Sequence, residues 1–393
     1  MKVHEIFTTI VAILLFLILK DEMFCIVENA ISTDILEKAV SRFYYVLLFI
    51  VSILYVVFYS VFNLKEIFSL NIVLLLGGIY FLSVLHSLFV PFSSIAYYIM
   101  IALPILLYVF IINATFYIDD TSFFDKLFIG FFFILVFYYF KTYNVRFQFQ
   151  SALTSSSAYA VLYFFPFILS VKNNLLKFVA VILTVIVVLL SYKRSGIIAL
   201  GLALSIYWLI IYYIDSNNTN KRVKKFLLTM FVLFIVYNIL IYDELGKENL
   251  LLIRFQNMSE DQGSGRIEVY NCTWNMIINS DMPGILLGHG WNSVLRDSSI
   301  KLSAHNDFLE VIYDFGVIVA FIYLLTLYKL IRYCINLIKN KSRFAPPFAA
   351  SIVIFIINSM FSHIIIYTNY LMIYTFFWGY IYIQYNKDLE CIE

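Results

Sequence analysis

Charged residues are scarce in this chain of 393 residues: 13% are Asp, Glu, Lys or Arg, whereas 62% are hydrophobic. Soluble proteins are about half apolar and about a quarter charged, so an ordinary soluble domain is excluded. The 27 basic and 25 acidic residues nearly cancel and form no strongly basic domain, which excludes the electrostatic footprint of a nucleic-acid-binding protein. The four cysteines are scattered and form no CxxC pair, so the sequence predicts neither a metal nor a redox centre.

No internal repeat at solenoid or propeller spacing is present, and no tract is of low complexity. Instead, long apolar runs recur, many of them near the length of about 20 residues that spans a bilayer as a helix. The runs are continuous rather than alternating, which favours helices over a β-barrel. We therefore expect an all-α polytopic membrane protein with a single transmembrane domain over residues 1–393. The predicted spans, about twelve, are 5–20, 43–62, 70–90, 94–113, 123–140, 157–171, 175–192, 195–214, 226–242, 306–328, 345–363 and 366–385.

Lys and Arg in short loops predict the orientation. Residues 221–225, between the eighth and ninth spans, and residues 329–343, between the tenth and eleventh, are both rich in Lys and Arg. Basic loops stay in the cytoplasm, and because two spans separate these two, both can be cytoplasmic together. The loop 243–304 between spans 9 and 10 then faces outward, and both termini are cytoplasmic. Charged residues rather than a small-residue cleavage site follow residues 6–19, so we expect an uncleaved first span.

The segment 243–304 is the one long polar stretch, and loops of this length in compact proteins are usually functional or disordered. Its Trp, Tyr, Ile and Leu residues argue against disorder. Apolar residues at helical spacing predict an amphipathic helix over 266–279 that lies along the outer membrane surface or over the mouth of a cavity. Pro283 and Gly284 are expected to end it.

Several short motifs fall on the predicted outer side. Ser191-Tyr192-Lys193-Arg194-Ser195-Gly196 ends one span and begins the next, and Gly265-Arg266 opens the amphipathic helix. Leu287-Gly288-His289-Gly290-Trp291, then Ala304-His305-Asn306-Asp307-Phe308-Leu309-Glu310 and Asp314-Phe315-Gly316, lead into the next span. Together they resemble the O-antigen polymerase and O-antigen ligase family of bacterial polysaccharide assembly, over about residues 185–330. Asp314 stands where the family tends to have Glu, which keeps the charge.

The resemblance implies a multi-span lipid-sugar glycosyltransferase (GT-C-like) architecture in the bacterial plasma (inner) membrane. Such enzymes take a glycan from undecaprenyl diphosphate on the outer leaflet and pass its reducing-end sugar to an acceptor hydroxyl. The implied partners are the undecaprenyl-diphosphate-linked oligosaccharide, the lipid bilayer and, among proteins, a chain-length regulator or a flippase. The resemblance implies neither a nucleotide sugar, nor a metal, nor another cofactor.

This chemistry assigns roles to three residues. Arg194 and Arg266 are the candidates for binding the diphosphate, because the planar guanidinium matches phosphate oxygens and stays charged. The outer segment lacks a paired-carboxylate motif such as DxD, with which many enzymes hold a divalent metal for this task. His305 is the candidate base for the acceptor hydroxyl, and two neighbouring cations would keep it neutral by lowering its pKa.

Five further residues are weaker candidates for substrate binding. Asp307 or Glu310 would orient His305, and His289, between two glycines, would join a backbone anion nest. Arg254 and Arg146 lie on the predicted outer side and would assist with phosphate or glycan. Trp274 and Trp291 are of the type that stacks on sugars or packs a loop.

Simpler interpretations exist for each. Arg194 and Lys193 can reach from a helix end to the headgroups, and Arg266 can be a solvated loop charge. His305-Asn306-Asp307 can cap the following helix, and His289 can be a turn residue. His363 and His86 are expected to be interfacial polar residues.

We favour a metal-independent, inverting polymerase of lipid-linked repeat units for O-antigen or capsular polysaccharide. The alternatives are a ligase that moves finished glycan to lipid A core, protein or wall, a transporter or flippase of the same lipid-linked sugars, and a structural scaffold. A transporter should carry polar residues near mid-span and inverted repeats, whereas here the notable polar residues gather at the outer boundary.

Overall fold

The computed structural model describes residues 3–28, 35–59, 67–89, 95–118, 120–141, 157–214 and 265–390. This part of the chain holds fourteen α-helices and no strand. Three short helices, α13 (Arg266–Ile278), α14 (Met282–Leu287) and α15 (Ser293–Asp297), stand apart from the rest. The other helices are α1 (Val3–Glu28), α2 (Ile35–Tyr59), α4 (Ile72–Ser87), α5 (Ile95–Tyr117), α6 (Thr121–Lys141), α8 (Ala158–Ser170), α9 (Asn174–Leu190), α10 (Arg194–Ile214), α16 (Asp307–Lys339), α17 (Ala345–Phe361) and α18 (Thr368–Glu390).

Five of the described helices, α1, α5, α6, α10 and α16, are long and apolar enough to cross a membrane, and five shorter helices are also apolar. The prediction of an all-helical polytopic membrane protein is therefore confirmed. Described helices overlap eleven of the twelve predicted spans, and 226–242 lies outside the described residues. How many helices cross the bilayer stays a prediction.

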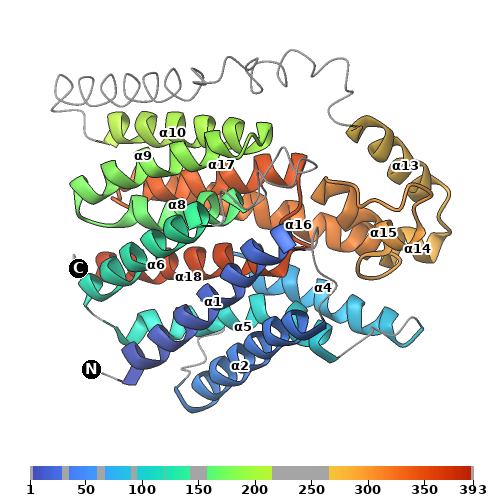
Figure 1. The fold of residues 1–393 in the computed structure, drawn as a ribbon, viewed down its shortest axis with the longest axis horizontal. Coiled ribbons are helices and arrows are strands. Elements are labelled where there is room, and N and C mark those ends of the chain that lie inside the picture. The colour runs from blue at the N-terminus through green and yellow to red at the C-terminus, as the bar shows by residue number, and fades with distance from the viewer. Residues whose placement is uncertain are drawn as a thin grey trace.

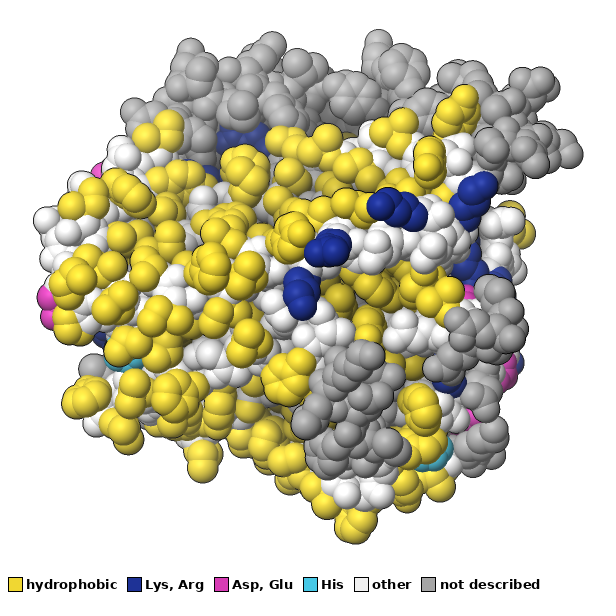
Figure 2. All heavy atoms as spheres, turned by 180° about the vertical axis from the view of Figure 1, so that it is seen from behind, with side chains coloured by type: hydrophobic (Ala, Val, Ile, Leu, Met, Phe, Trp, Pro, Cys, Tyr) yellow, Lys and Arg dark blue, Asp and Glu magenta, His cyan; other side chains and the backbone are white. Residues whose placement is uncertain are grey.

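The outside of the bundle is apolar. Large side chains such as Val57 of α2, Phe81 of α4 and Leu209 of α10 are at least 65% exposed. Figure 2 shows hydrophobic side chains over most of one face, with Lys and Arg confined to a few places. Apolar patches of this extent are rare on soluble monomers and are typical of surfaces that face lipid.

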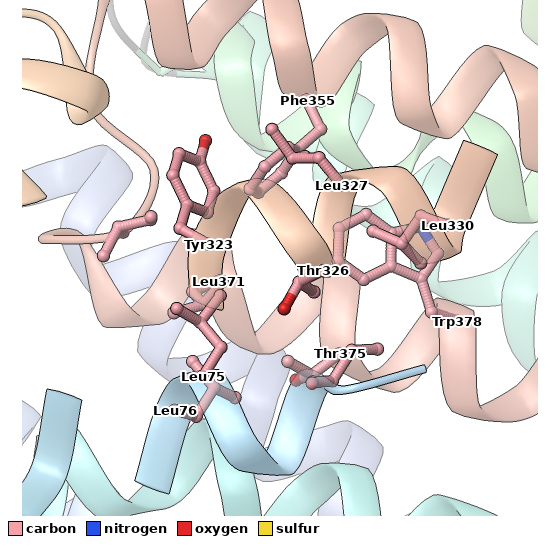
Figure 3. Close-up of a pocket in the computed structure, with 12 residues that line it drawn as sticks. Leu75, Leu76, Tyr323, Thr326, Leu327, Leu330, Phe355, Leu371, Thr375 and Trp378 are labelled. Carbon is pink, nitrogen blue, oxygen red and sulfur yellow. The ribbon is translucent and has the colours of Figure 1, made fainter. Parts of the chain in front are cut away.

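The centre of the bundle is closely packed. Helix α8 is buried along its whole length, and its Phe164 and Phe167 rings stack with centroids 4.3 Å apart. Between α4, α16, α17 and α18 a cavity of about 10 Å³ is left, beside Thr326 and Trp378 (Figure 3). Such a space holds one water molecule at most, so no sugar fits between these helices.

The two ends of the bundle differ. Helices α13, α14 and α15 lie at one end, whereas the first turn of α1 and the last turn of α18 lie at the opposite end (Figure 1). The end of α4 also reaches the α13–α15 end, where Nε2 of His86 lies 3.1 Å from the carbonyl oxygen of Leu287. We call this the capped end.

Helix α13 lies where helical spacing predicted a helix over 266–279. Its buried side chains are Val269 and Thr273, whereas Ile267, Trp274 and Ile278 of the predicted apolar face are 51–60% exposed. The observed packing face of α13 therefore differs from the predicted one: Val269, Thr273 and the partly buried Met276 and Ile277 face the neighbouring segments, and Ile267, Trp274 and Ile278 lie outward. Helix α13 ends at Ile278, and the proline expected to end it instead lies in the first turn of α14.

Two glycines let the loop after α14 lie directly on the backbone of α16. Gly288 and Gly316 both have a φ of about 75°, which glycine adopts readily. A Cβ added to Gly288 would lie 2.3 Å from the carbonyl oxygen of Asp314, and one added to Gly316 would lie 2.3 Å from that of Leu286. The Gly290 amide donates to the Asp314 carbonyl at 2.8 Å. This contact kinks α16 at Gly316 and turns its first part, Asp307–Phe315, toward the capped end.

Candidate active site

Four segments meet at the capped end: the start of α10, the start of α13, residues 303–310 and the turn between α17 and α18. The Tyr270 hydroxyl of α13 donates to the carbonyl oxygens of Met360, at 3.1 Å, and His305, at 3.4 Å. The imidazole of His305 lies against that of His363, with ring centroids 4.5 Å apart. Residues far apart in the sequence therefore build one site.

His305 directly precedes α16 and has a φ of 52°, in the left-handed region that non-glycine residues seldom adopt. Capping of α16 is carried by Asn306, whose side-chain oxygen accepts from the amides of Phe308 and Leu309. His305 is therefore not needed as the cap. Burial, then the charges of Arg266 and Lys193, lower the pKa of His305 to about 4. Its imidazole is neutral near pH 7, as a base must be.

Arg266 is the first residue of α13 and is half-buried. Gly265, with a φ of 74°, makes the turn that directs the chain into the helix. One helical turn later, Tyr270 fixes α13 to α17 and to the His305 backbone. The charge of Arg266 acts on His305, on His363 and on the hydroxyl of Tyr159. Arg266 is therefore more than a solvated loop charge.

Lys193 and Arg194 lie where α10 begins. Tyr192, with a φ of 53°, makes the turn between α9 and α10, and Arg194 is the first residue of the helix. Ser195 directly follows Arg194, and its Oγ lies 2.6 Å from the hydroxyl oxygen of Tyr159. The charge of Arg266 also acts on this Tyr159 hydroxyl. Sequence reasoning assigned only headgroup contact to Lys193, whereas the structure places its charge beside His305. Arg194 is half-buried and directly follows it.

His363 is the residue that sequence reasoning missed. It is 3% exposed, and its Nε2 lies 3.0 Å from Ser303 Oγ. Its Nδ1 has no hydrogen-bond partner among the described residues and lies 3.7 Å from Glu310 Oε1. Burial, then the proximity of His305 and Arg266, lower the pKa of His363 to about 3. Two neutral imidazoles thus lie side by side, and only the predicted outward position of the turn before α18 could have indicated this.

Asp307 and Glu310 are buried and bind backbone groups of the site. The Asp307 carboxylate accepts from the amides of Ile364 and Ile365, at 3.0–3.4 Å, and so holds the turn that carries His363. Glu310 Oε1 accepts from the Ala304 amide at 2.6 Å, which fixes the residue before His305. Both side chains are at most 1% exposed, so they hold the backbone of the site in place and are not open to solvent.

His289 and Asp314 support the loop that lies on α16. The ring of His289 stacks on Tyr313 at 4.4 Å, and its Nε2 lies 2.9 Å from Ser280 Oγ. Asp314 accepts from the Ser293 hydroxyl at 2.6 Å and from the amides of Asn292 and Val294. His289 thus contacts Ser280, Tyr313 and Arg296 rather than Arg266 or His305. Arg146 and Arg254 lie outside the described residues.

The match to a known family covers this same region. Residues 179–324 match the family model described as O-antigen ligase. This part of the chain is similar to the O-antigen ligase family. The match runs from α9 into α16 and includes Lys193, Arg194, Arg266 and His305, so the predicted resemblance is confirmed. His363 lies beyond it. A comparison with curated proteins found no match. Members of the O-antigen ligase family transfer glycans, which supports an enzyme of polysaccharide assembly at the membrane.

Proposed function

We propose that the chain polymerises undecaprenyl-diphosphate-linked oligosaccharide repeat units by metal-independent, inverting glycosyl transfer at the outer face of the plasma membrane. One observation carries the proposal: the charges of Arg266 and Lys193 act on a half-buried, neutral His305 at the capped end of the bundle. Cations are what a diphosphate leaving group needs, and a neutral imidazole is what an acceptor hydroxyl needs.

The donor diphosphate would lie across the starts of α10 and α13. Arg266 and Arg194 would each offer a planar fork to the phosphate oxygens, and Lys193 would add a point charge. These groups would neutralise the charge that builds up on the bridging oxygen as the sugar–phosphate bond breaks. The carboxylates nearest to His305 in the sequence, Asp307 and Glu310, already accept from backbone amides.

The acceptor would approach His305 from the other side. His305 would take the hydroxyl proton as the acceptor oxygen forms a bond to C1 of the donor sugar. The bond between C1 and the diphosphate oxygen breaks with its electron pair on the leaving undecaprenyl diphosphate. Attack opposite to the leaving group inverts the configuration at C1. The proton then passes from His305 to the product diphosphate or to water.

Donor binding would also activate the base. Burial, and then the charges of Arg266 and Lys193, lower the pKa of His305 to about 4, which makes the imidazole a weak proton acceptor in the free enzyme. A bound diphosphate would offset the charges of Arg266 and Lys193 and so raise the pKa of His305 by the part of the shift that these cations cause, while the part due to burial remains. The base would then become effective only with donor in place, which suppresses side reactions.

The orientation rests on charge. The end of α16 opposite His305 and the turn after it carry five exposed basic residues, as expected for cytoplasmic loops; they are Lys329, Arg332, Lys339, Lys341 and Arg343. The site would then face the outer leaflet, where undecaprenyl-linked glycans present their sugars.

The test is a transfer assay with the purified chain in lipid nanodiscs. The donor is the lipid-linked oligosaccharide that accumulates in cells lacking this chain. We expect the wild type to make a ladder of polymers and Arg266→Ala to lose at least about a hundredfold in rate. Arg332→Ala, which removes an exposed arginine at the other end of the bundle, is the control. A normal ladder from Arg266→Ala would refute the role of this arginine.

The second candidate is a ligase, because the matching family model bears that description. The chemistry at His305 and Arg266 is the same, and the acceptor differs. Attachment of a finished glycan to lipid A core, protein or wall, with no ladder formed from single repeat units, would identify the ligase.

A further inference from the structure

Beside His363, on the side of α5, lies a cavity of about 230 Å³. It is enclosed by the start of α5, residues 291–303 and the turn between α17 and α18. Three aromatic rings line it, those of Tyr97, Trp291 and Tyr367, together with the polar side chains of Ser303, His363 and Asn369. Because His363 also lies against His305, the cavity adjoins the candidate base.

The lining indicates the class of ligand. None of the described residues that line the cavity is an Asp, Glu, Lys or Arg. A diphosphate therefore finds no counter-charge there, whereas Lys193, Arg194 and Arg266 lie at the starts of α10 and α13 and are not part of the lining. The volume is below the range of about 300–1,000 Å³ typical of sites for drug-sized ligands, so it suits one small ring. A pyranose fits this chemistry, since its C–H face packs on aromatic rings and its hydroxyls bind amide, hydroxyl and imidazole groups.

Contacts with residues around the cavity hold its lining side chains in place. The indole of Trp291 packs on the fully buried Phe315, with centroids 5.8 Å apart. The Ser303 hydroxyl and His363 Nε2 contact each other at 3.0 Å. Asp307 fixes the turn that carries His363 through the amides of Ile364 and Ile365. A rigid wall loses little side-chain entropy when a ligand binds.

We propose that this cavity is the subsite for the terminal sugar ring of the acceptor glycan, packed against Trp291 and with its reacting hydroxyl directed past His363 to His305. The assignment rests on the proposed function. It separates the two substrates by charge: the cations at α10 and α13 take the donor diphosphate, and the uncharged aromatic cavity takes the acceptor sugar.

The test measures the two substrates separately. The donor is the lipid-linked oligosaccharide described above, and the acceptor probe is the same oligosaccharide released from its lipid diphosphate. With Trp291→Ala we expect the acceptor KM to rise about tenfold, the loss of one aromatic stacking contact, while the donor KM stays within about twofold. Trp291→Phe should recover most of the affinity. Trp274→Ala is the matched control, because Trp274 lies 51% exposed on α13, outside this cavity.

A second variant fills the cavity instead of opening it. Leu295 lines the cavity and is 40% exposed, so Leu295→Trp can place an indole there without disturbing the core. We expect it to abolish transfer to the released oligosaccharide while binding of undecaprenyl diphosphate is kept. An unchanged acceptor KM in both variants, or a rise in the donor KM instead, would overturn the assignment. Absence of any transfer by the wild type would overturn the proposed function, and the subsite with it.

Discussion

The pH dependence of transfer gives a sharp test of the base and the cations around it. His305 acts as a base only when neutral, so activity falls as the pH drops through its pKa. In the free enzyme that pKa is about 4, because burial, Arg266 and Lys193 all disfavour the imidazolium. The acidic limb of kcat/KM reports the free enzyme, and that of kcat reports the enzyme with substrate bound. Because bound diphosphate offsets the cations but not the burial, we expect the acidic limb of kcat to lie at a higher pH than that of kcat/KM, by less than the full shift.

Replacing one cation should move the acidic limb of kcat/KM more than that of kcat. In Lys193→Met the charge of Arg266 and the burial of His305 remain, so the kcat/KM limb should rise by a few tenths to about one pH unit. The kcat limb should move less, because the donor already neutralises this charge in the wild-type complex. Initial rates from about pH 3 to 8, on both sides of the expected pKa values, measure both limbs. Lys301→Met is the control, since Lys301 lies at the same end and binds the Arg296 carbonyl. Coincident limbs in the wild type, unmoved by Lys193→Met, would refute the reasoning.

Three further predictions concern donor binding, the fold and the topology. Arg194→Lys should slow transfer about tenfold or more, because a bidentate fork becomes a point charge; a wild-type rate would mean that Arg194 only reaches the headgroups. Gly316→Ala should lower the unfolding temperature in detergent and cost about 1–3 kcal/mol, because the new Cβ meets the Leu286 carbonyl. Gly77→Ala, with open space around its Cβ, is the control, and equal melting of the two would argue against the backbone contact. A cysteine at position 266, in a chain whose native cysteines, Cys272 among them, are replaced, should react with an impermeant reagent from outside intact cells; protection there would reverse the orientation.

Much of the fold was predictable because lipid leaves few choices. Backbone groups in hydrocarbon must be bonded within the segment, so a continuous apolar run is a helix. For the same reason the described helices fall on the predicted runs. Because successive spans cross the membrane in opposite directions, the order of the runs also predicted that His86, Lys193, His305 and His363 would share one end. The contact of His86 in α4 with Leu287 in α14, and that of His305 with His363, agree with this prediction.

The details of the site were less predictable, because they depend on contacts across the fold. His363 becomes a partner of His305 only through the path of the turn that Asp307 holds by two backbone amides. Asp307 was expected to orient His305, and nothing local in the sequence shows that its side chain is buried and binds the Ile364 and Ile365 amides. The close approach of Gly288 to α16 involves backbone atoms alone and leaves no side-chain pattern beyond a pair of glycines.

The most direct test of the central claim is an experimental map of the chain with undecaprenyl diphosphate bound. We predict diphosphate density between the starts of α10 and α13, in contact with Arg266 and within reach of Lys193 and Arg194, with the ring of His305 beside the terminal phosphate. Diphosphate bound elsewhere on the bundle, away from Arg266 and His305, would contradict the account.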